Sequence, residues 1–342
     1  METKQFTLWD RRSETCPFSE FIEDDDDNCH SFDNFKNGYD FLAEDHPDLA
    51  KWLADTRGVG FGNIKSVAPL NLELPSFSFI PVVRRGSSKI LNGVIPPFVG
   101  VSIGDVVTGK SLSVPNEIRS KFGINPKSKV ILFCFGKDDL IEKIWTERKT
   151  VFPKIASLGF DLVTGINYSI WLNHPHAERL INLKRSLITF EEFQKLGVPA
   201  IPHMYWYGHK DILRWCDWIK DNKNVNLIAV DPQTERKNQI WEQTVKDLEF
   251  FVSHLDRKIH FLIIGPSTKK RIEQLKAVLP KFSLANGSCS RRAACGFLIS
   301  PKDGVLEYKY SEIPRNKILV RDITIYQNIL NKIGYVSGQN TE

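Results

Sequence analysis

The chain has 342 residues, of which 42% are hydrophobic and 25% are charged, and its formal net charge is +5 at pH 7. These proportions are ordinary for a folded globular protein, and no apolar stretch approaches the roughly 18–20 residues that a membrane span requires. Residues 1–15 lack the apolar core of a secretory signal, and the cysteines form no CxxC pair, as expected for free thiols in a reducing compartment. We therefore expect a cytoplasmic protein without a membrane partner.

The charge is unevenly distributed along the chain. Residues 1–64 contain 6 basic and 15 acidic residues, whereas the remainder contains 40 basic and 26 acidic residues. The basic remainder favours a polyanionic partner, and we expect nucleic acid, with DNA favoured over RNA. The acidic run Glu23–Asp27 is typical of a solvated segment; the alternative is that it mimics phosphate and shields the basic face.

Two regions are expected: an acidic, loosely ordered N-terminal extension over residues 1–64 and one barrel domain over residues 65–342. Within the extension, the spacing of apolar residues predicts a helix over Asp45–Asp55. Near the other end, we expect a hairpin or extended excursion over residues 304–318 and a closing helix over Arg321–Ile333.

From Phe77 onward, short apolar runs that end in polar turns alternate with helical patterns, which is typical of parallel strands buried on both faces. The predicted strands are Phe77–Val83, Pro97–Val101, Val130–Phe135, Phe160–Gly165, Pro199–Tyr205, Asn226–Val230, Ile259–Ile264 and Phe282–Ala285. The main helices predicted between them are Asp138–Ile155, His176–Leu196, Lys210–Asp221, Asn238–Leu255 and Lys269–Val278. The fold class is therefore α/β, and the pattern predicts a (β/α)8 TIM-like barrel. No clear helix follows the first strand, so an open doubly wound sheet is the alternative.

In such a barrel the residues that follow each strand meet at one end. Asn167 follows the fourth predicted strand, His203 lies near the end of the fifth, and Asp231 directly follows the sixth. A carboxylate suits the cleavage of an N-glycosidic bond, which passes through an oxocarbenium-like state. Asp231, Asn167 and His203 are therefore the candidate catalytic residues. The alternative for Asp231, which precedes Pro232, is that it caps the next helix or makes an Asx turn.

Two further groups of residues lie at the same strand ends. Aromatic side chains there could sandwich a base extruded from nucleic acid, although such residues often only close a core. With one amide, the candidate base-binding residues are Tyr168, Trp171, Tyr205, Trp206 and Gln233. Basic side chains at strand ends suit phosphate groups, and these candidates are Arg84, Arg85, Lys269, Arg291 and Arg292. No HExxH or paired CxxC motif supports a metal, and no cofactor is predicted.

The segment HFLIIGPSTKKRIEQLKAVLPKFSLANGSCSRRAACG resembles, in layout, the late barrel of tRNA-guanine transglycosylases and of related enzymes that insert 7-deazaguanine into DNA. The segments GINYSIWLNHPHAERLINLKRS and GVPAIPHMYW resemble an uncharacterised family of phage and mobile-element proteins. These resemblances span roughly residues 125–300 and imply a barrel that processes a flipped nucleobase. The cysteine-rich zinc motif and the base-recognition motif of the transglycosylases are absent, so simple excision by water fits this chain better than base exchange.

The leading hypothesis is a DNA glycosylase or transglycosylase that acts on a flipped, possibly modified base, in a setting such as defence against phages. A second hypothesis is a non-catalytic nucleic-acid-binding protein of a mobile element. A third is a barrel lyase or hydrolase for a small molecule, whose basic residues hold a phosphate or carboxylate.

Overall fold

The computed structural model describes residues 49–109, 111–170, 176–235, 237–302 and 305–335. Its main sheet contains nine strand segments, all paired in parallel, in the order β5-β4-β3-β2-β1-β9-β8-β7-β6. The segments are β1 (Phe79–Val83), β2 (Phe98–Ser102), β3 (Lys129–Phe133), β4 (Leu162–Thr164), β5 (Ala200–Ile201), β6 (His203–Met204), β7 (Leu227–Val230), β8 (His260–Ile264) and β9 (Phe282–Asn286). All eight predicted strands are thus present.

The two ends of the sheet are joined through Pro202. β5 pairs with β4 and β6 pairs with β7, while only Pro202 separates β5 from β6. Proline has no N–H to give to a sheet ladder, which divides this strand into two segments. Its carbonyl still accepts a hydrogen bond from the Ala229 N–H at 2.9 Å. The chain therefore forms a TIM-like barrel of eight strands, the fifth of which is bent, rather than an open doubly wound sheet.

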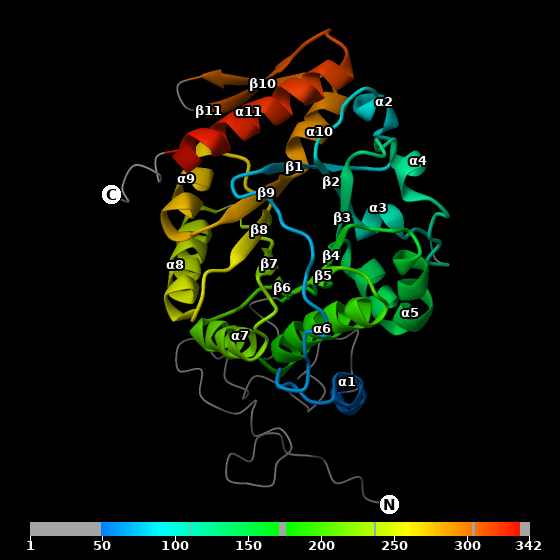
Figure 1. The fold of residues 1–342 in the computed structure, drawn as a ribbon, viewed down its shortest axis with the longest axis vertical. Coiled ribbons are helices and arrows are strands. Elements are labelled where there is room, and N and C mark those ends of the chain that lie inside the picture. Colours follow the sequence, from blue (N-terminus) through cyan, green and yellow to red (C-terminus); the bar gives the residue numbers. More distant parts are fainter. Residues whose placement is uncertain (1–48, 110, 171–175, 236, 303–304, 336–342) are drawn as a thin grey trace, which may run out of the picture.

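Helices surround this barrel (Figure 1). The longer ones are α5 (Asp138–Ala156), α6 (His176–Lys195), α7 (His209–Asp221), α8 (Asn238–His254), α9 (Lys269–Val278) and α11 (Arg315–Tyr335). The shorter ones are α1 (Leu49–Thr56), α2 (Ser88–Leu91), α3 (Ile103–Val106), α4 (Ile118–Phe122) and α10 (Ser288–Ala294). The expected hairpin forms slightly earlier than predicted, from β10 (Phe297–Lys302) and β11 (Val305–Tyr310).

The last helix covers the outside of the first strand. The connection from β1 to β2 contains only the four-residue α2, which is too short to cover a strand. Instead, Tyr326 of α11 stacks on Phe79 of β1 with ring centroids 4.5 Å apart. The Gln327 side-chain oxygen accepts from the Phe79 N–H at 2.9 Å. This packing explains why the sequence shows no clear helix after the first strand.

Residues 49–64, which the sequence analysis assigned to the acidic extension, pack against the barrel. Trp52, Phe61 and Ile64 belong to the main hydrophobic core, and the buried Lys184 of α6 donates to the Gly60 carbonyl and to Asn63. The acidic run at residues 23–27 lies outside the described residues.

The barrel interior is a packed apolar cluster. It includes Ile80, Val82, Ile131, Phe133, Leu162, Ile201, Ala229, Leu262, Ile264 and Ala285, with Leu72 and Leu74 of the preceding segment. Gly100 of β2 leaves the room that the Phe133 ring occupies, because a Cβ atom at Gly100 would lie 2.3 Å from Phe133 Cε2. Chemistry is thereby confined to the ends of the barrel.

This close approach gives a prediction for stability. We expect Gly100→Ala to lower the free energy of unfolding by about 1–3 kcal/mol, because the added methyl overpacks the interior against Phe133. Gly62→Ala is the control, since a Cβ atom at Gly62 would have no neighbour within 4 Å. Urea denaturation of both variants measures the effect, and equal stabilities would contradict the described interior packing.

Candidate active site

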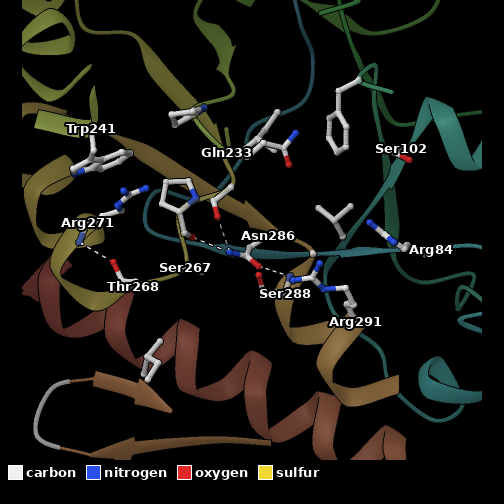
Figure 2. A pocket seen from close by; sticks show the side chains of 18 of the residues that line it. Arg84, Ser102, Gln233, Trp241, Ser267, Thr268, Arg271, Asn286, Ser288 and Arg291 are labelled. Atoms are coloured by element: carbon white, nitrogen blue, oxygen red, sulfur yellow. Dashed lines mark hydrogen bonds between the residues drawn. The ribbon is translucent and has the colours of Figure 1, made fainter. Parts of the chain in front are cut away.

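A cleft of about 1250 Å³ opens at the C-terminal ends of β1, β2, β3, β7, β8 and β9. Val82, Phe135 and Ile264, at the top of the interior cluster, form its floor. Figure 2 shows Arg84, Asn286, Ser288 and Arg291 on one side of it and Trp241, Thr268 and Arg271 on the other. Catalytic sites of parallel barrels lie at this end because the loops after the strands converge there.

The loops after β8 and β9 are held together by the Asn286 side chain. Asn286 is 1% exposed, and its Nδ2 donates to the Gly265 carbonyl at 3.0 Å and the Pro266 carbonyl at 2.9 Å. Its Oδ1 accepts from the Ser288 N–H at 2.5 Å. One buried amide therefore satisfies backbone groups of both loops and fixes their separation (Figure 2).

The cleft is strongly basic. Its lining contains six basic residues, Arg84, Lys137, Lys269, Lys270, Arg271 and Arg291, and two acidic residues, Asp105 and Glu242. Lys269 has an ion-pair partner in Glu273 at 3.5 Å. Within the described part of the chain, Arg84, Lys137, Lys270 and Arg291 have no acidic partner. Unpaired cations gathered in a concave site attract an anionic ligand.

Asp231 lies beside this cleft rather than in its lining. Its Oδ1 accepts from the Gln233 N–H at 3.1 Å, and its Oδ2 accepts from Gln233 Nε2 at 2.9 Å. Gln233 does line the cleft, so the carboxylate lies next to a residue of the cleft lining. The hydrogen bond from the Gln233 N–H, two residues along the chain, forms an Asx turn. The sequence analysis gave such a turn as the alternative role of Asp231. The turn fixes the orientation of the carboxylate, and it does not prevent the carboxylate from taking part in chemistry.

The pKa of Asp231 is raised to about 7, mainly because burial removes water from the carboxylate. Hydrogen bonds from Gln233 and from the Asn167 side chain oppose this rise, while the nearby Glu235 carboxylate adds to it. The structure thus brings Asp231 and Asn167 together, as expected for residues that follow two strands of one barrel. A carboxyl group with a pKa near 7 can both donate and accept a proton at neutral pH.

Glu235 is a second carboxyl group at this position that the sequence analysis did not select. Burial raises its pKa to about 7, and the Thr244 hydroxyl and Arg271 oppose the rise. Thr244 donates to its carboxylate, and Arg271 donates to its backbone carbonyl at 2.8 Å. Arg271 also lies over the Trp241 ring at 4.5 Å. The only sequence signal was that Glu235 is in the same short loop as Asp231.

His203 lies inside the barrel and not in the cleft. It pairs in register with Ala229, whose side chain belongs to the interior cluster, so its imidazole points inward as well. It is fully buried, and no described residue gives either ring nitrogen a hydrogen bond of good geometry. Burial lowers its pKa to about 4, although the Gly165 backbone opposes this shift. The imidazole is therefore neutral at pH 7.

The candidate phosphate-binding residues divide into two groups. Arg84, Lys269 and Arg291 line the cleft. Arg85 instead donates to the Asp105 carbonyl at 2.9 Å, and Arg292 lies over the Tyr308 ring at 4.6 Å. Of the two neighbours Arg84 and Arg85, and of the two neighbours Arg291 and Arg292, only the first therefore lines the cleft.

Of the candidate base-binding residues that the structure describes, only Gln233 lines the cleft. Tyr168 is fully buried, with the Arg185 guanidinium 3.9 Å from its ring centroid. Tyr205 donates to the Asn182 carbonyl of α6 at 2.7 Å, and Trp206 donates to Asp247 of α8 at 2.7 Å. The described aromatic candidates therefore pack against the surrounding helices instead of facing the cleft. The helices give these side chains apolar surface and hydrogen-bond acceptors. Trp171 lies outside the described residues.

The raised pKa of Asp231 predicts a pH dependence of stability. Between about pH 3.8 and pH 7 the folded chain keeps a proton that the unfolded chain releases. The stabilising contribution is present below this range and is lost as the pH rises through it. We expect Asp231→Asn to become progressively more stable relative to the wild type from pH 4 to pH 7, by at most about 4 kcal/mol.

Urea denaturation at several pH values measures this difference between variant and wild type. Asp139→Asn, an exposed carboxylate at the start of α5, controls for general effects of removing a charge. A difference for Asp231→Asn that stays constant from pH 4 to pH 8 would contradict the prediction.

Comparison with known proteins does not assign the chain to a family. No protein-family model matches the chain, and no curated protein matches it. The described residues contain no group of three or more histidine, cysteine, aspartate or glutamate side chains arranged to hold a metal ion. Among the described helices, none combines the length and the apolar character needed to cross a membrane.

Proposed function

We propose that this protein is an enzyme that cleaves the N-glycosidic bond between a nucleobase and the sugar of a phosphate-bearing substrate, with a DNA strand as the expected substrate. The observation that carries the proposal is the arrangement at the barrel mouth. A carboxyl group with a pKa of about 7 is held by two amide groups beside a cleft lined by six basic residues. The cations would bind phosphate, and the carboxyl group would serve the reaction.

The proposed reaction breaks the bond between the sugar C1′ atom and a ring nitrogen of the base. Protonated Asp231 gives its proton to the departing base, and the sugar passes through an oxocarbenium-like state. Water then bonds to C1′ and returns a proton to the carboxylate, so that the enzyme is restored. A pKa near the working pH suits both steps. The Asn167 and Gln233 amides orient the carboxyl group and stabilise its ionised form.

A second candidate is an enzyme for a phosphorylated small molecule, such as a lyase or hydrolase. The observation that favours it is the small stacking surface that the described residues give the cleft, where Phe135 is a half-buried aromatic side chain on the floor. Trp241 is the only tryptophan or tyrosine among the described residues that line the cleft, and it is 2% exposed. Retention on heparin that falls steeply with salt would favour nucleic acid over this candidate. Binding without formation of abasic sites would favour a non-catalytic nucleic-acid-binding protein.

The decisive experiment is incubation of the protein with modified and unmodified phage DNA, followed by detection of alkali-labile sites. We expect Asp231→Asn to lower the rate of base release at least about a hundredfold, which corresponds to roughly 2.7 kcal/mol of barrier, with little change in DNA binding. Asn keeps the size of the side chain but cannot transfer the proton.

Asp139→Asn is the matched control, since Asp139 is exposed on α5 and does not line the cleft. Full activity in Asp231→Asn would exclude this residue as the acid. The wild type leaving no alkali-labile sites on any DNA tested would contradict the proposed reaction on DNA.

A further inference from the structure

One wall of the cleft, formed by the ends of β1, β8 and β9, presents hydrogen-bond donors to the ligand space. Its backbone carbonyls are bonded to donors inside the protein. Gly265 and Pro266 accept from Asn286, Ser267 accepts from the Tyr326 hydroxyl at 3.1 Å, and Val82 accepts from the Ser290 hydroxyl. The polar side chains that line this wall include the Ser267 and Ser288 hydroxyl groups and the Arg84 and Arg291 guanidinium groups. A wall of this kind favours an anion over a cation or a neutral group.

The two arginines come from different elements and converge on this wall. Arg84 follows β1 and Arg291 belongs to α10, and Figure 2 shows both on the same side of the cleft near Ser288. Both are exposed, and neither has an ion-pair partner among the described residues. The Ser290 hydroxyl of α10 donates to the Val82 carbonyl at the end of β1, so the backbone segments that carry the two arginines are held together before a ligand arrives. An anion that binds there does not have to order these segments, which lowers the cost of binding.

We propose that this wall binds the terminal phosphate monoester of the substrate, as a dianion. The two guanidinium groups balance the two negative charges of the dianion. Each guanidinium group can also donate two parallel hydrogen bonds to two oxygens of one phosphate. Charge favours a monoester over a diester, because a monoester brings two negative charges to the two guanidinium groups whereas a diester brings one. Val82, Phe135 and Ile264 line the floor beside this wall and offer a phosphate no side-chain hydrogen-bond donor.

The identity of the group attached to this phosphate rests on the proposed function, whereas the phosphate site itself does not. A nucleoside would bring the monoester either as a free mononucleotide or as the phosphorylated end of a DNA strand. Both sources offer the same dianion to Arg84 and Arg291. Each leaves the rest of the nucleotide in the cleft, which Gln233 also lines.

Two pairs of neighbouring arginines provide a matched test. Arg84→Gln and Arg291→Gln remove cations that line the cleft, while Arg85→Gln and Arg292→Gln remove the same charge one residue away, outside the lining. The shift in Tm is measured at constant ionic strength with inorganic phosphate, a deoxynucleoside 5′-monophosphate, a dinucleoside monophosphate without a terminal phosphate, and a 5′-phosphorylated oligonucleotide. Each variant is compared with its own Tm without ligand.

We expect phosphate and the monophosphate to raise the Tm of the wild type, Arg85→Gln and Arg292→Gln. Arg84→Gln and Arg291→Gln should bind both at least about tenfold more weakly. The dinucleoside monophosphate should also bind the wild type at least about tenfold more weakly than the monophosphate. Whichever of the monophosphate and the phosphorylated oligonucleotide binds more tightly identifies the source of the monoester.

The proposal is overturned if phosphate and the monophosphate do not raise the Tm of the wild type, if all four variants lose binding equally, or if the diester binds as well as the monoester. Asp231→Asn separates this result from the proposed reaction, because it should keep phosphate binding. Phosphate binding without base release from any nucleotide or DNA would refute only the proposed reaction. Base release that persists without phosphate binding would refute only the phosphate site.

Discussion

The buried amide of Asn286 is the interaction on which the mouth of this barrel depends. Parallel strands end independently of one another, and nothing in a strand itself sets the distance between the loops that follow. Asn286 supplies that constraint by donating to two carbonyls of the loop after β8 and accepting from the Ser288 N–H after β9. The Tyr326 hydroxyl holds the same β8 loop from α11. An apolar residue at position 286 would leave these buried backbone groups without partners, each at a cost of roughly 1–3 kcal/mol.

The barrel itself followed from local sequence, because buried parallel strands read as continuous apolar runs. Leu227–Val230 and His260–Ile264 lie within one or two residues of their predicted bounds. Sequence reasoning was weakest where one element substitutes for another far away in the chain. The short α2 leaves β1 uncovered, and α11, more than two hundred residues later, covers it through Phe79, Tyr326 and Gln327. No local pattern around Phe79 signals this partner.

The candidate site was predictable in its location and less so in its members. Strand ends correctly placed Asp231 beside Asn167, and they placed Arg84 and Arg291 at the cleft. Whether a residue after a strand faces the ligand or the protein depends on the local direction of the loop or helix that carries it, which separates Arg84 from Arg85 and Arg291 from Arg292. The tyrosines illustrate the opposite error, since α6 offers Tyr168 a guanidinium and Tyr205 a carbonyl acceptor. Hydrophobicity alone cannot distinguish a ligand platform from such packing.

Gln233 connects the Asp231 carboxyl group to the loop after β8, which forms part of the wall proposed to bind phosphate. Its Cβ packs so closely against Gly265 that a Cβ atom there would lie 2.3 Å from it, and Gly265 also has a φ of +112°. Glycine at this position therefore lets the loops after β7 and β8 touch. On one side of this contact, the Gln233 side chain donates to the Asp231 carboxylate. On the other side, the Gly265 carbonyl accepts from the Asn286 side chain. A phosphate held at the wall would thus present the rest of its substrate to the carboxyl group at a set distance. Most of the advantage of such a site is positional, because the orientation is fixed before the bond begins to break.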